Sequence, residues 1–410
     1  MRNLFKINIP ILLMSLVILS ISTSTQAESS NTSLEEINLG ISITLKEWYE
    51  NQSGLTGDDE VFGAYVTLPI ENELYIGLAS ARPAENSGDG AYFAKFDGTQ
   101  ISGIGHFDEQ GIHEMIWDGE VIHVAGTDPH NVITEGNNWY SGNHYHYSLD
   151  NRTLTKYRDP VNGLVYVFHA WGLWKDGNIL YAAVSSHDGS YPSDCVSGVT
   201  CKGQIFSSTD DGITWELKSD LGGFRAYDII GNGNELYAIH NDEGNGPLSL
   251  SKGSDGGESW IIFPELTENV LRSHMVRQNG QIIATSFDRT SIYAIDRSNN
   301  VKIHPIPSGF LIGTSYSDTP AFTDFKILVT SAGYLYLIAE DQNTDERVIF
   351  RTSNLETWQE ITRTSENLIS LSYWEGNNWL VTGSNGVNAK LWRVDLNNLT
   401  TLVFLPIVIK

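Results

Sequence analysis

The stretch Asp176-Gly-Asn-Ile-Leu-Tyr-Ala182 places a polar turn directly before a short apolar run. Related phrases, with Gly or Asn in the turn and aliphatic or aromatic residues in the run, occur seven times. They begin at Glu71, Asp118, Asp176, Asn232, Asn279, Ala332 and Glu375. The apolar anchors of neighbouring copies lie 44 to 59 residues apart. Units of this length, built from short β runs, are typical of propeller blades, so we predict an all-β, seven-bladed β-propeller with four-stranded antiparallel blades.

Apolar patterning places four strands within the third unit. We expect the innermost strand at residues 165–174, the second at 179–185, the third at 204–208 and the outermost at 215–218. The innermost strand is almost continuously apolar, as a strand buried on both faces should be. After the N-terminal segment, no part of the chain shows a convincing 3.6-residue apolar period, so helix should be a minor component.

The N-terminus reads as a secretory signal over residues 1–27, with Arg2 and Lys6 before an apolar run and Thr25-Gln26-Ala27 as the cleavage site. We therefore expect a secreted or periplasmic protein. The propeller should occupy residues 59–410, preceded by an N-terminal segment at 28–58 that could supply a ring-closing strand. Two stretches are candidates for ring closure, residues 41–48 and residues 402–409, and the sequence does not decide between them.

Three polar turns share a second pattern. Ser208-Thr-Asp-Asp-Gly-Ile-Thr-Trp215 fits Ser-x-Asp-x-Gly-x-Thr-Trp at every specified position, while 254–260 and 352–358 are weaker copies. We expect the Asp carboxylate to accept backbone N–H bonds across the turn, the Gly to take a positive φ, and the Trp to pack between blades. The residues with these structural roles are Asp210, Gly212, Trp215, Asp255, Gly257, Trp260, Asn354 and Trp358.

With these three turns in phase with the repeat, the chain resembles the Asp-box (BNR-repeat) β-propellers, a sialidase-like superfamily of secreted carbohydrate-active and binding proteins. The resemblance covers roughly residues 60–405. It implies that the Asp turns join the third and fourth strands of a blade, on the face away from the ligand. The Phe-Arg-Ile-Pro motif of true sialidases does not occur here, and Arg82 stands in Ala-Arg-Pro. We therefore do not expect sialidase activity.

The beginnings of the innermost strands should meet at the mouth of the central channel, and here they are polar. They supply His113, His169, Arg225, Arg272, His274 and Asp324. His169, Arg225 and Asp324 each lie 12 residues before the anchor of their unit, which predicts equivalent positions around the ring. Imidazole, guanidinium and carboxylate groups converging at one mouth could bind an acidic sugar and move protons. Alternatively, they could simply hydrogen-bond strand ends and channel water.

Three loops between second and third strands are long and should rise on the same face, at residues 80–90, 126–142 and 185–203. Long loops on one side of a ring usually build a binding cleft. The second of them adds Asp128, His130, Trp139, Tyr140 and His144 to the candidate site. The third carries Cys195 and Cys201, which we expect to form a disulfide in an oxidising compartment.

Three functions fit this pattern. The first, which we favour, is recognition of an acidic or complex polysaccharide at the mouth without catalysis. The second is a carbohydrate-active enzyme, either a glycoside hydrolase or a polysaccharide lyase. Hydrolysis needs paired carboxylates, and Asp128 with Asp324 is the pair that we can place near the mouth. The third is a protein-interaction scaffold outside the cytoplasm. If the protein is an enzyme, the catalytic candidates are His169, Arg225, Asp324 and Tyr140.

The chain carries 25 Lys and Arg against 50 Asp and Glu, a formal charge of −25. Such a charge argues against nucleic acid and anionic lipid as partners, and no later stretch is apolar enough to insert into a membrane. We expect a monomer whose partner is a glycan. No cofactor is expected. His144 and His146 lack a following carboxylate at metal-ligand spacing, so we expect no metal site there, although acid-rich loops could hold Ca²⁺.

Overall fold

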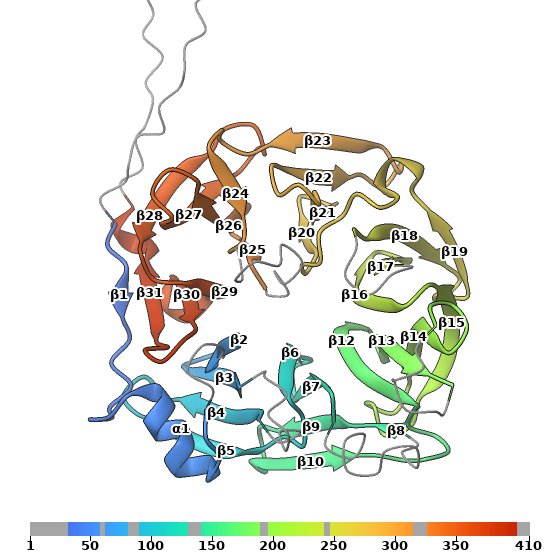
Figure 1. Cartoon of the computed structure of the whole chain (residues 1–410), viewed down its shortest axis with the longest axis horizontal. Coiled ribbons are helices and arrows are strands. Elements are labelled where there is room, and N and C mark those ends of the chain that lie inside the picture. The colour runs from blue at the N-terminus through green and yellow to red at the C-terminus, as the bar shows by residue number, and fades with distance from the viewer. Residues whose placement is uncertain are drawn as a thin grey trace, which may run out of the picture.

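The computed structural model describes residues 32–57, 62–80, 90–129, 141–188, 196–241, 247–314 and 326–399. Antiparallel sheets follow one another around a central opening, in chain order, as the colours of Figure 1 show. Strands β2, β6, β12, β16, β20, β25 and β29 lie nearest the centre of this ring. The protein is therefore an all-β propeller, as predicted.

The strand bounds follow the chain. The first sheet holds β2 (Phe62–Ile70), β3 (Glu73–Ser80), β4 (Tyr92–Phe96) and β5 (Ile101–His106). The next holds β6 (Gly111–Trp117), β7 (Val121–Thr127), β9 (His144–Ser148), β10 (Thr153–Tyr157), β12 (Val167–Asp176), β13 (Ile179–His187), β14 (Cys201–Ser208) and β15 (Glu216–Gly222). A small two-stranded sheet pairs β8 (Ser141–Gly142) with β11 (Leu164–Val165).

The remaining sheets continue the ring. One holds β16 (Arg225–Asn232), β17 (Glu235–Asn241), β18 (Ser249–Ser254) and β19 (Ser259–Ile262). Another holds β20 (Val276–Gln278), β21 (Gln281–Thr285), β22 (Ser291–Ile295) and β23 (Val301–Pro305). A five-stranded sheet holds β24 (Phe310–Ile312), β25 (Leu328–Ser331), β26 (Tyr334–Asp341), β27 (Arg347–Thr352) and β28 (Gln359–Thr364). The last holds β29 (Leu368–Trp374), β30 (Trp379–Ser384), β31 (Leu391–Asp395) and β1 (Glu35–Glu36).

The prediction of seven separate blades is wrong. Among the described residues, five sheets of four or five strands are separate blades, whereas the second and third predicted units are continuous in one sheet of eight strands. His169 of β12 pairs with Thr127 of β7, and the Asp128 N–H donates to the Phe168 carbonyl at 2.8 Å. This sheet, called the joined sheet below, links β6, β7, β9 and β10 to β12, β13, β14 and β15. Apolar periodicity within each unit carries no information about such a bond between units.

The repeated polar phrase forms the tight turn between the first and second strands of a unit. Asn279 and Gly280 connect β20 to β21 with φ of +51° and +79°. Ala332 and Gly333 connect β25 to β26 with φ of +49° and +81°. Two central residues with positive φ are the pattern of a type I′ hairpin turn, whose twist matches that of the strands it joins. The repeat is therefore a hairpin signal, which explains why it marks every unit.

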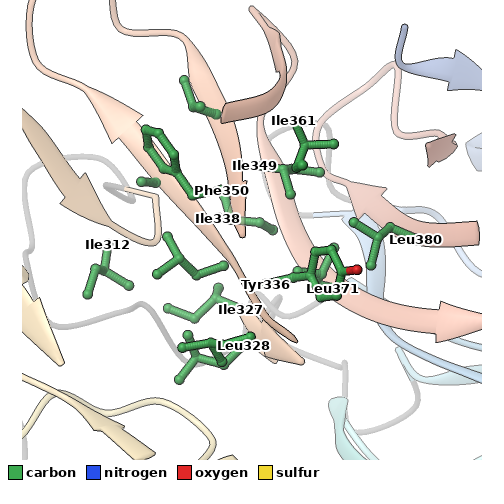
Figure 2. Close-up of a cluster of buried hydrophobic side chains, with 14 of the residues drawn as sticks. Ile312, Ile327, Leu328, Tyr336, Ile338, Ile349, Phe350, Ile361, Leu371 and Leu380 are labelled. Carbon is green, nitrogen blue, oxygen red and sulfur yellow. The ribbon is translucent and has the colours of Figure 1, made fainter. Parts of the chain in front are cut away.

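The core fills the spaces between neighbouring sheets. Figure 2 shows one part of it, where Tyr336 of the five-stranded sheet lies beside Leu371 of the last sheet. Almost no surface of these side chains is exposed. Full burial of one such side chain contributes about 1.5–3 kcal/mol. Sheet-to-sheet packing of this kind holds the ring together and fixes the positions of the innermost strands.

The N-terminal segment completes the last sheet, because β1 pairs with β31. Residues 41–48 do not form the closing strand considered from the sequence. Helix α1 (Leu45–Ser53) begins there instead, capped by Thr44, which exchanges hydrogen bonds with Glu47. The helix buries Tyr49 against the Phe62 ring, with centroids 4.9 Å apart. Three short 3₁₀ segments, Pro264–Leu266, Glu375–Asn377 and Leu396–Asn398, are the remaining helical elements described.

Several predictions about the termini and the third loop fall on residues that the structure does not describe. The signal segment at 1–27 and the alternative closing stretch at 402–409 both lie outside the described residues. Cys201 is buried and is not a free thiol, but Cys195 is not described, so their disulfide stays a prediction. Within the described part of the chain, none of the helices has the length and apolar character needed to span a bilayer.

Candidate functional site

Trp171 is the centre of a cluster at the channel end where the innermost strands begin. The His169 ring stacks on it and the His113 ring meets its edge, both with centroids 4.5 Å away. The guanidinium carbon of Arg272 lies 4.1 Å from its centroid, and that of Arg225 lies 5.7 Å away. Four of the residues predicted from the sequence therefore meet on one indole ring. A cation over an aromatic face is attracted by the ring quadrupole.

These side chains surround a small hollow, called the mouth site below. It is lined by His113, Trp171, Tyr227, Arg272, Ser273 and His274. Tyr227 contributes a second aromatic wall, with the guanidinium carbon of Arg272 4.5 Å from its ring centroid. The residues come from β6, β12, β16 and the segment just before β20, which Figure 1 places around one side of the ring centre.

A β-bulge recurs in the innermost strands and directs three of these side chains toward the mouth site. The pairing of β6 with β7 shifts register between Ile112 and Glu114, which leaves His113 as an extra residue. Corresponding shifts leave Trp171 as the extra residue in β12 and Tyr227 in β16. A β-bulge bends its strand and redirects a side chain, and bulges are common beside functional sites. The mouth site is thus built from equivalent bulges of successive units.

A buried charge network lies against the mouth site. His274 Nδ1 is 3.1 Å from a Glu114 carboxylate oxygen and 3.3 Å from one of Asp228, and Lys326 Nζ donates to Glu114 at 2.5 Å. Burial opposes the charge of His274, but the two carboxylates raise its pKa to about 10. Burial also disfavours ionised Glu114, yet Lys326 and His274 lower its pKa to about 2. At neutral pH His274 and Glu114 are therefore both charged, and their opposite charges compensate each other.

Unlike His274, the two histidines His169 and His113 are neutral. Burial lowers the pKa of His169 to about 4, against the pull of Asp128, whose carboxylate lies 3.1 Å from Nε2. Burial, reinforced by the positive charge of Arg272, holds the pKa of His113 well below its usual range. Both imidazoles are therefore neutral at pH 7. The guanidinium groups of Arg225 and Arg272 therefore lie beside neutral imidazoles at this mouth.

Arg225 has unused hydrogen-bonding capacity. It begins β16, and its guanidinium carbon lies 4.6 Å from the Phe224 ring centroid. Its Nε atom is buried and has no hydrogen-bond partner among the described residues. A buried donor without a partner is costly and is often satisfied by a water or a ligand. Arg225 is therefore suited to contact an acceptor at the mouth.

The remaining predicted site residues are either not described or lie elsewhere. Tyr140, Asp324, His130 and Trp139 lie outside the described residues, so the Asp128–Asp324 carboxylate pair that hydrolysis would need stays a prediction. His144 is described and is not at the mouth. It lies on β9 with its ring 5.4 Å from that of His123 and 5.5 Å from that of Trp215. The strand order, which the sequence does not show, makes β9 the third strand from the centre.

The three Asp-type turns lie between β14 and β15, β18 and β19, and β27 and β28, at the strand ends remote from the mouth. In the first, Asp210 accepts from Thr214 N at 2.8 Å and from Thr214 Oγ1 at 2.6 Å, and Gly212 has φ +82°. In the third, Asn354 accepts from the Thr357 N–H at 2.9 Å. These bonds fix local turns.

The second turn is held differently, because no backbone N–H bond to the Asp255 carboxylate is found in the described residues. There Gly257 has φ +89°, and the Trp260 indole donates to the Gly257 carbonyl at 2.8 Å. In the first turn, the Trp215 indole likewise donates to the Gly212 carbonyl at 3.0 Å. In the third, the Trp358 indole donates to the Pro305 carbonyl at 3.2 Å.

Sequence reasoning missed Trp171, Tyr227, Glu114, Asp228 and Lys326. A signal existed for the two aromatic residues, since each lies ten residues before the Tyr anchor of its own unit, Tyr181 or Tyr237. For Glu114, Asp228 and Lys326, we found no such spacing signal in the sequence. Lys326 and Glu114 come from distant units, and only the closed ring brings them together.

No protein-family model and no curated protein matches the chain. Solved structures do match it. A streptogramin B lyase aligns with a TM-score of 0.51 and 14% identity over 88% of this chain and 97% of that one. A catalytically inactive virginiamycin B lyase from Staphylococcus aureus, with quinupristin, gives a TM-score of 0.54 and 12% identity over 89% and 99%.

The extracellular domain of a one-component system from B. thetaiotaomicron gives a TM-score of 0.56 and 12% identity, over 90% of this chain and 43% of that one. The chain is a β-propeller. At such low identities the likeness extends to the fold alone, and the propeller's activity must be inferred from its own residues.

Proposed function

We propose that this propeller binds an acidic glycan, such as a uronate-containing polysaccharide, at the mouth site. The observation that carries the proposal is the convergence of Arg225 and Arg272 on the Trp171 ring, in a chain of formal charge −25. Guanidinium groups bind carboxylates strongly and with defined geometry. A local positive site in an acidic protein selects an anionic group on its ligand while the remaining surface repels non-specific polyanions.

The aromatic residues support a sugar as the carrier of that anionic group. Trp171 and Tyr227 give the hollow two ring walls, and His113 and Ser273 add polar groups between them. The hollow has a volume of only about 10 Å³, so it would contact one group of the sugar while the rest of the glycan lies outside it. The signal-like residues 1–27 and the Asp-box pattern of 208–215 support placement of the protein outside the cytoplasm, among secreted carbohydrate-binding propellers.

A binding assay with matched polysaccharides tests this proposal. Calorimetry with polygalacturonate, alginate and a sulfated glycosaminoglycan should show binding to at least one, whereas dextran, a neutral polymer, should not bind. The affinity should fall as ionic strength rises, because salt screens the guanidinium–anion attraction. Absence of binding to every acidic polymer at low salt would contradict the proposal.

A second candidate, β-elimination at a uronate, is favoured by the presence of His113 and Tyr227 in the same hollow as Arg272. Arg272 would neutralise the uronate carboxylate and neutral His113 would take the proton from C5. The electron pair would form a C4–C5 double bond as the C4–O bond breaks, and Tyr227 would give a proton to the leaving oxygen. The base is then His113 and not His169, whose Nε2 already contacts Asp128.

The elimination candidate has its own readout. A lyase produces an unsaturated uronate that absorbs in the ultraviolet, together with new chain ends. If an acidic polysaccharide binds and neither product appears, the propeller is a binding protein without catalysis. The two candidates can therefore be separated with the same ligands.

A further inference from the structure

A second cluster of metal-ligating groups lies in the joined sheet, outside the mouth site. Asp118 lies in the turn between β6 and β7, His123 on β7, and Asp211 in the turn between β14 and β15. One potential ligand atom from each of these three residues lies within 4.8 Å of the other two. His123 Nε2 is 3.1 Å from Asp118 Oδ2. Two carboxylates and an imidazole thus converge from both halves of the joined sheet.

Further imidazoles lie beside this cluster. His146 of β9 pairs directly with His123 across the strands, and their rings are nearly parallel, with centroids 5.5 Å apart. The Nε2 atom of His146 is buried and has no hydrogen-bond partner among the described residues. His144, two residues earlier, also stacks on His123, with ring centroids 5.4 Å apart. Buried imidazole nitrogens without partners are unusual, and a bound ion or water is one way to satisfy them.

The cluster already holds a positive charge. The ammonium group of Lys175, on β12, donates to Asp118 and to Asp211, the latter at 2.7 Å. Burial opposes ionisation of Asp118, but Lys175 and the N–H groups of Val121 and Glu120 lower its pKa. The Lys175 ammonium group therefore lies between the two carboxylates, where a metal cation would have to replace it.

We propose that Asp118, His123, His146 and Asp211 form a site for a divalent transition metal ion of the zinc type, which replaces the Lys175 ammonium group. Two imidazole nitrogens and two carboxylate oxygens provide the four ligands that zinc prefers. Asp118, His123 and His146 belong to the first half of the joined sheet and Asp211 to the second. The ion would therefore act as a cross-link between the halves, independent of ligand binding at the mouth.

A second group of three potential metal ligands is less suited to bind an ion. It consists of Glu114, Asp228 and His274. His274 is protonated at neutral pH, because its pKa is raised to about 10 despite burial, so it has no free lone pair for a metal. Lys326 also pairs with Glu114. We therefore expect bound metal at the Asp118 cluster and not at the Glu114 cluster, and variants of the Asp118 cluster can test this.

Zinc titration of the untagged full chain, first stripped with a chelator, tests the proposal. Calorimetry should show one equivalent of Zn²⁺ bound, and saturating zinc should raise the melting temperature by on the order of 3 °C. Mg²⁺ and Ca²⁺ should not bind this cluster, because they prefer sites made only of oxygen ligands. The absence of stoichiometric zinc binding would overturn the proposal.

Single-residue variants test which side chains bind the zinc ion, and a control variant shows whether a substitution alone disturbs the fold. His123→Gln and His146→Gln should each weaken zinc binding by about tenfold or more. Lys175→Met should strengthen it by about tenfold, because a competing cation is removed. His304→Gln, a buried histidine on β23, serves as the matched control and should bind zinc as the parent does. Equal affinities in the parent, His146→Gln and Lys175→Met would place the metal elsewhere and overturn the assignment.

Discussion

The guanidinium carbon of Arg272 lies 4.1 Å from the ring centroid of Trp171, although Trp171 lies in β12 and Arg272 in the segment between β19 and β20. Trp171 reaches this position because it is the extra residue of a bulge in β12. Arg272 reaches it because its segment crosses between β19 and β20 at the channel mouth. The contact therefore depends on how the ring is assembled, and it defines where an anionic ligand would meet the protein.

Replacement of Tyr227 by Phe separates binding from elimination. The ring that faces Arg272 is retained, so polysaccharide affinity should change by no more than about twofold. If the propeller is a lyase, loss of the hydroxyl should lower the rate of ultraviolet-absorbing product formation by about 10²-fold or more. Stopped assays on the two proteins at equal ligand saturation measure this. A Tyr227→Phe protein with undiminished lyase activity would exclude Tyr227 as the proton donor.

His274 predicts a decrease in stability at alkaline pH. Its pKa is about 10 in the folded protein, against about 6.5 for an unperturbed His in the unfolded chain. A raised pKa contributes stability that is complete below about pH 6.5 and is lost as the pH rises through about 10. Denaturant unfolding at pH 6, 8 and 10 should show this decrease.

His274→Gln should remove that part of the pH dependence. It should also cost about 3–5 kcal/mol at neutral pH, because Glu114 and Asp228 lose a buried partner. His304→Gln is the control, since His304 has a lowered pKa caused first by burial, and it should retain the alkaline decrease. Parallel pH profiles for the parent and His274→Gln would contradict the assigned protonation state.

The first two Asp-type turns should respond differently to the same substitution. Asp210 accepts from the N–H and the hydroxyl of Thr214, so Asp210→Asn should lower the free energy of unfolding by about 1 kcal/mol. Asp255 accepts only a long bond from Ser254 Oγ at 3.3 Å among its described contacts. Asn also tolerates the φ of +52° at this position. Asp255→Asn should therefore stay within about 0.5 kcal/mol of the parent, and a larger loss there than at position 210 would contradict the assigned hydrogen bonds.

Features of the fold that depend on short stretches of sequence could be predicted. The turn phrase predicted an all-β propeller because Asn279-Gly280 and its counterparts form hairpins wherever they occur. Polar strand beginnings also predicted that His113, His169, Arg225 and Arg272 would meet. The sequence could not predict that Thr127 and His169 pair across two units, so seven separate blades were expected where two units form the joined sheet. It also could not reveal pairs such as Lys326 and Glu114, which meet only when the ring closes.

The zinc site that we propose in the joined sheet shows the same limit of sequence reasoning. His144 and His146 were expected not to bind a metal, because no carboxylate follows them at ligand spacing. Asp118 and Asp211 come from turns in both halves of the joined sheet. Spacing along the chain therefore could not bring carboxylate and imidazole together, and only strand pairing does so.

The most direct test of the mouth site compares two arginines that both stack on tryptophan. Arg272 lies over Trp171 at the mouth, and Arg393 lies over Trp379 at 4.2 Å in the last sheet. With an acidic polysaccharide that the parent binds, Arg272→Gln should raise the dissociation constant by about tenfold to a hundredfold. Arg393→Gln should leave it unchanged. Equal affinity for all three proteins, or an effect confined to Arg393→Gln, would contradict anion recognition at this mouth.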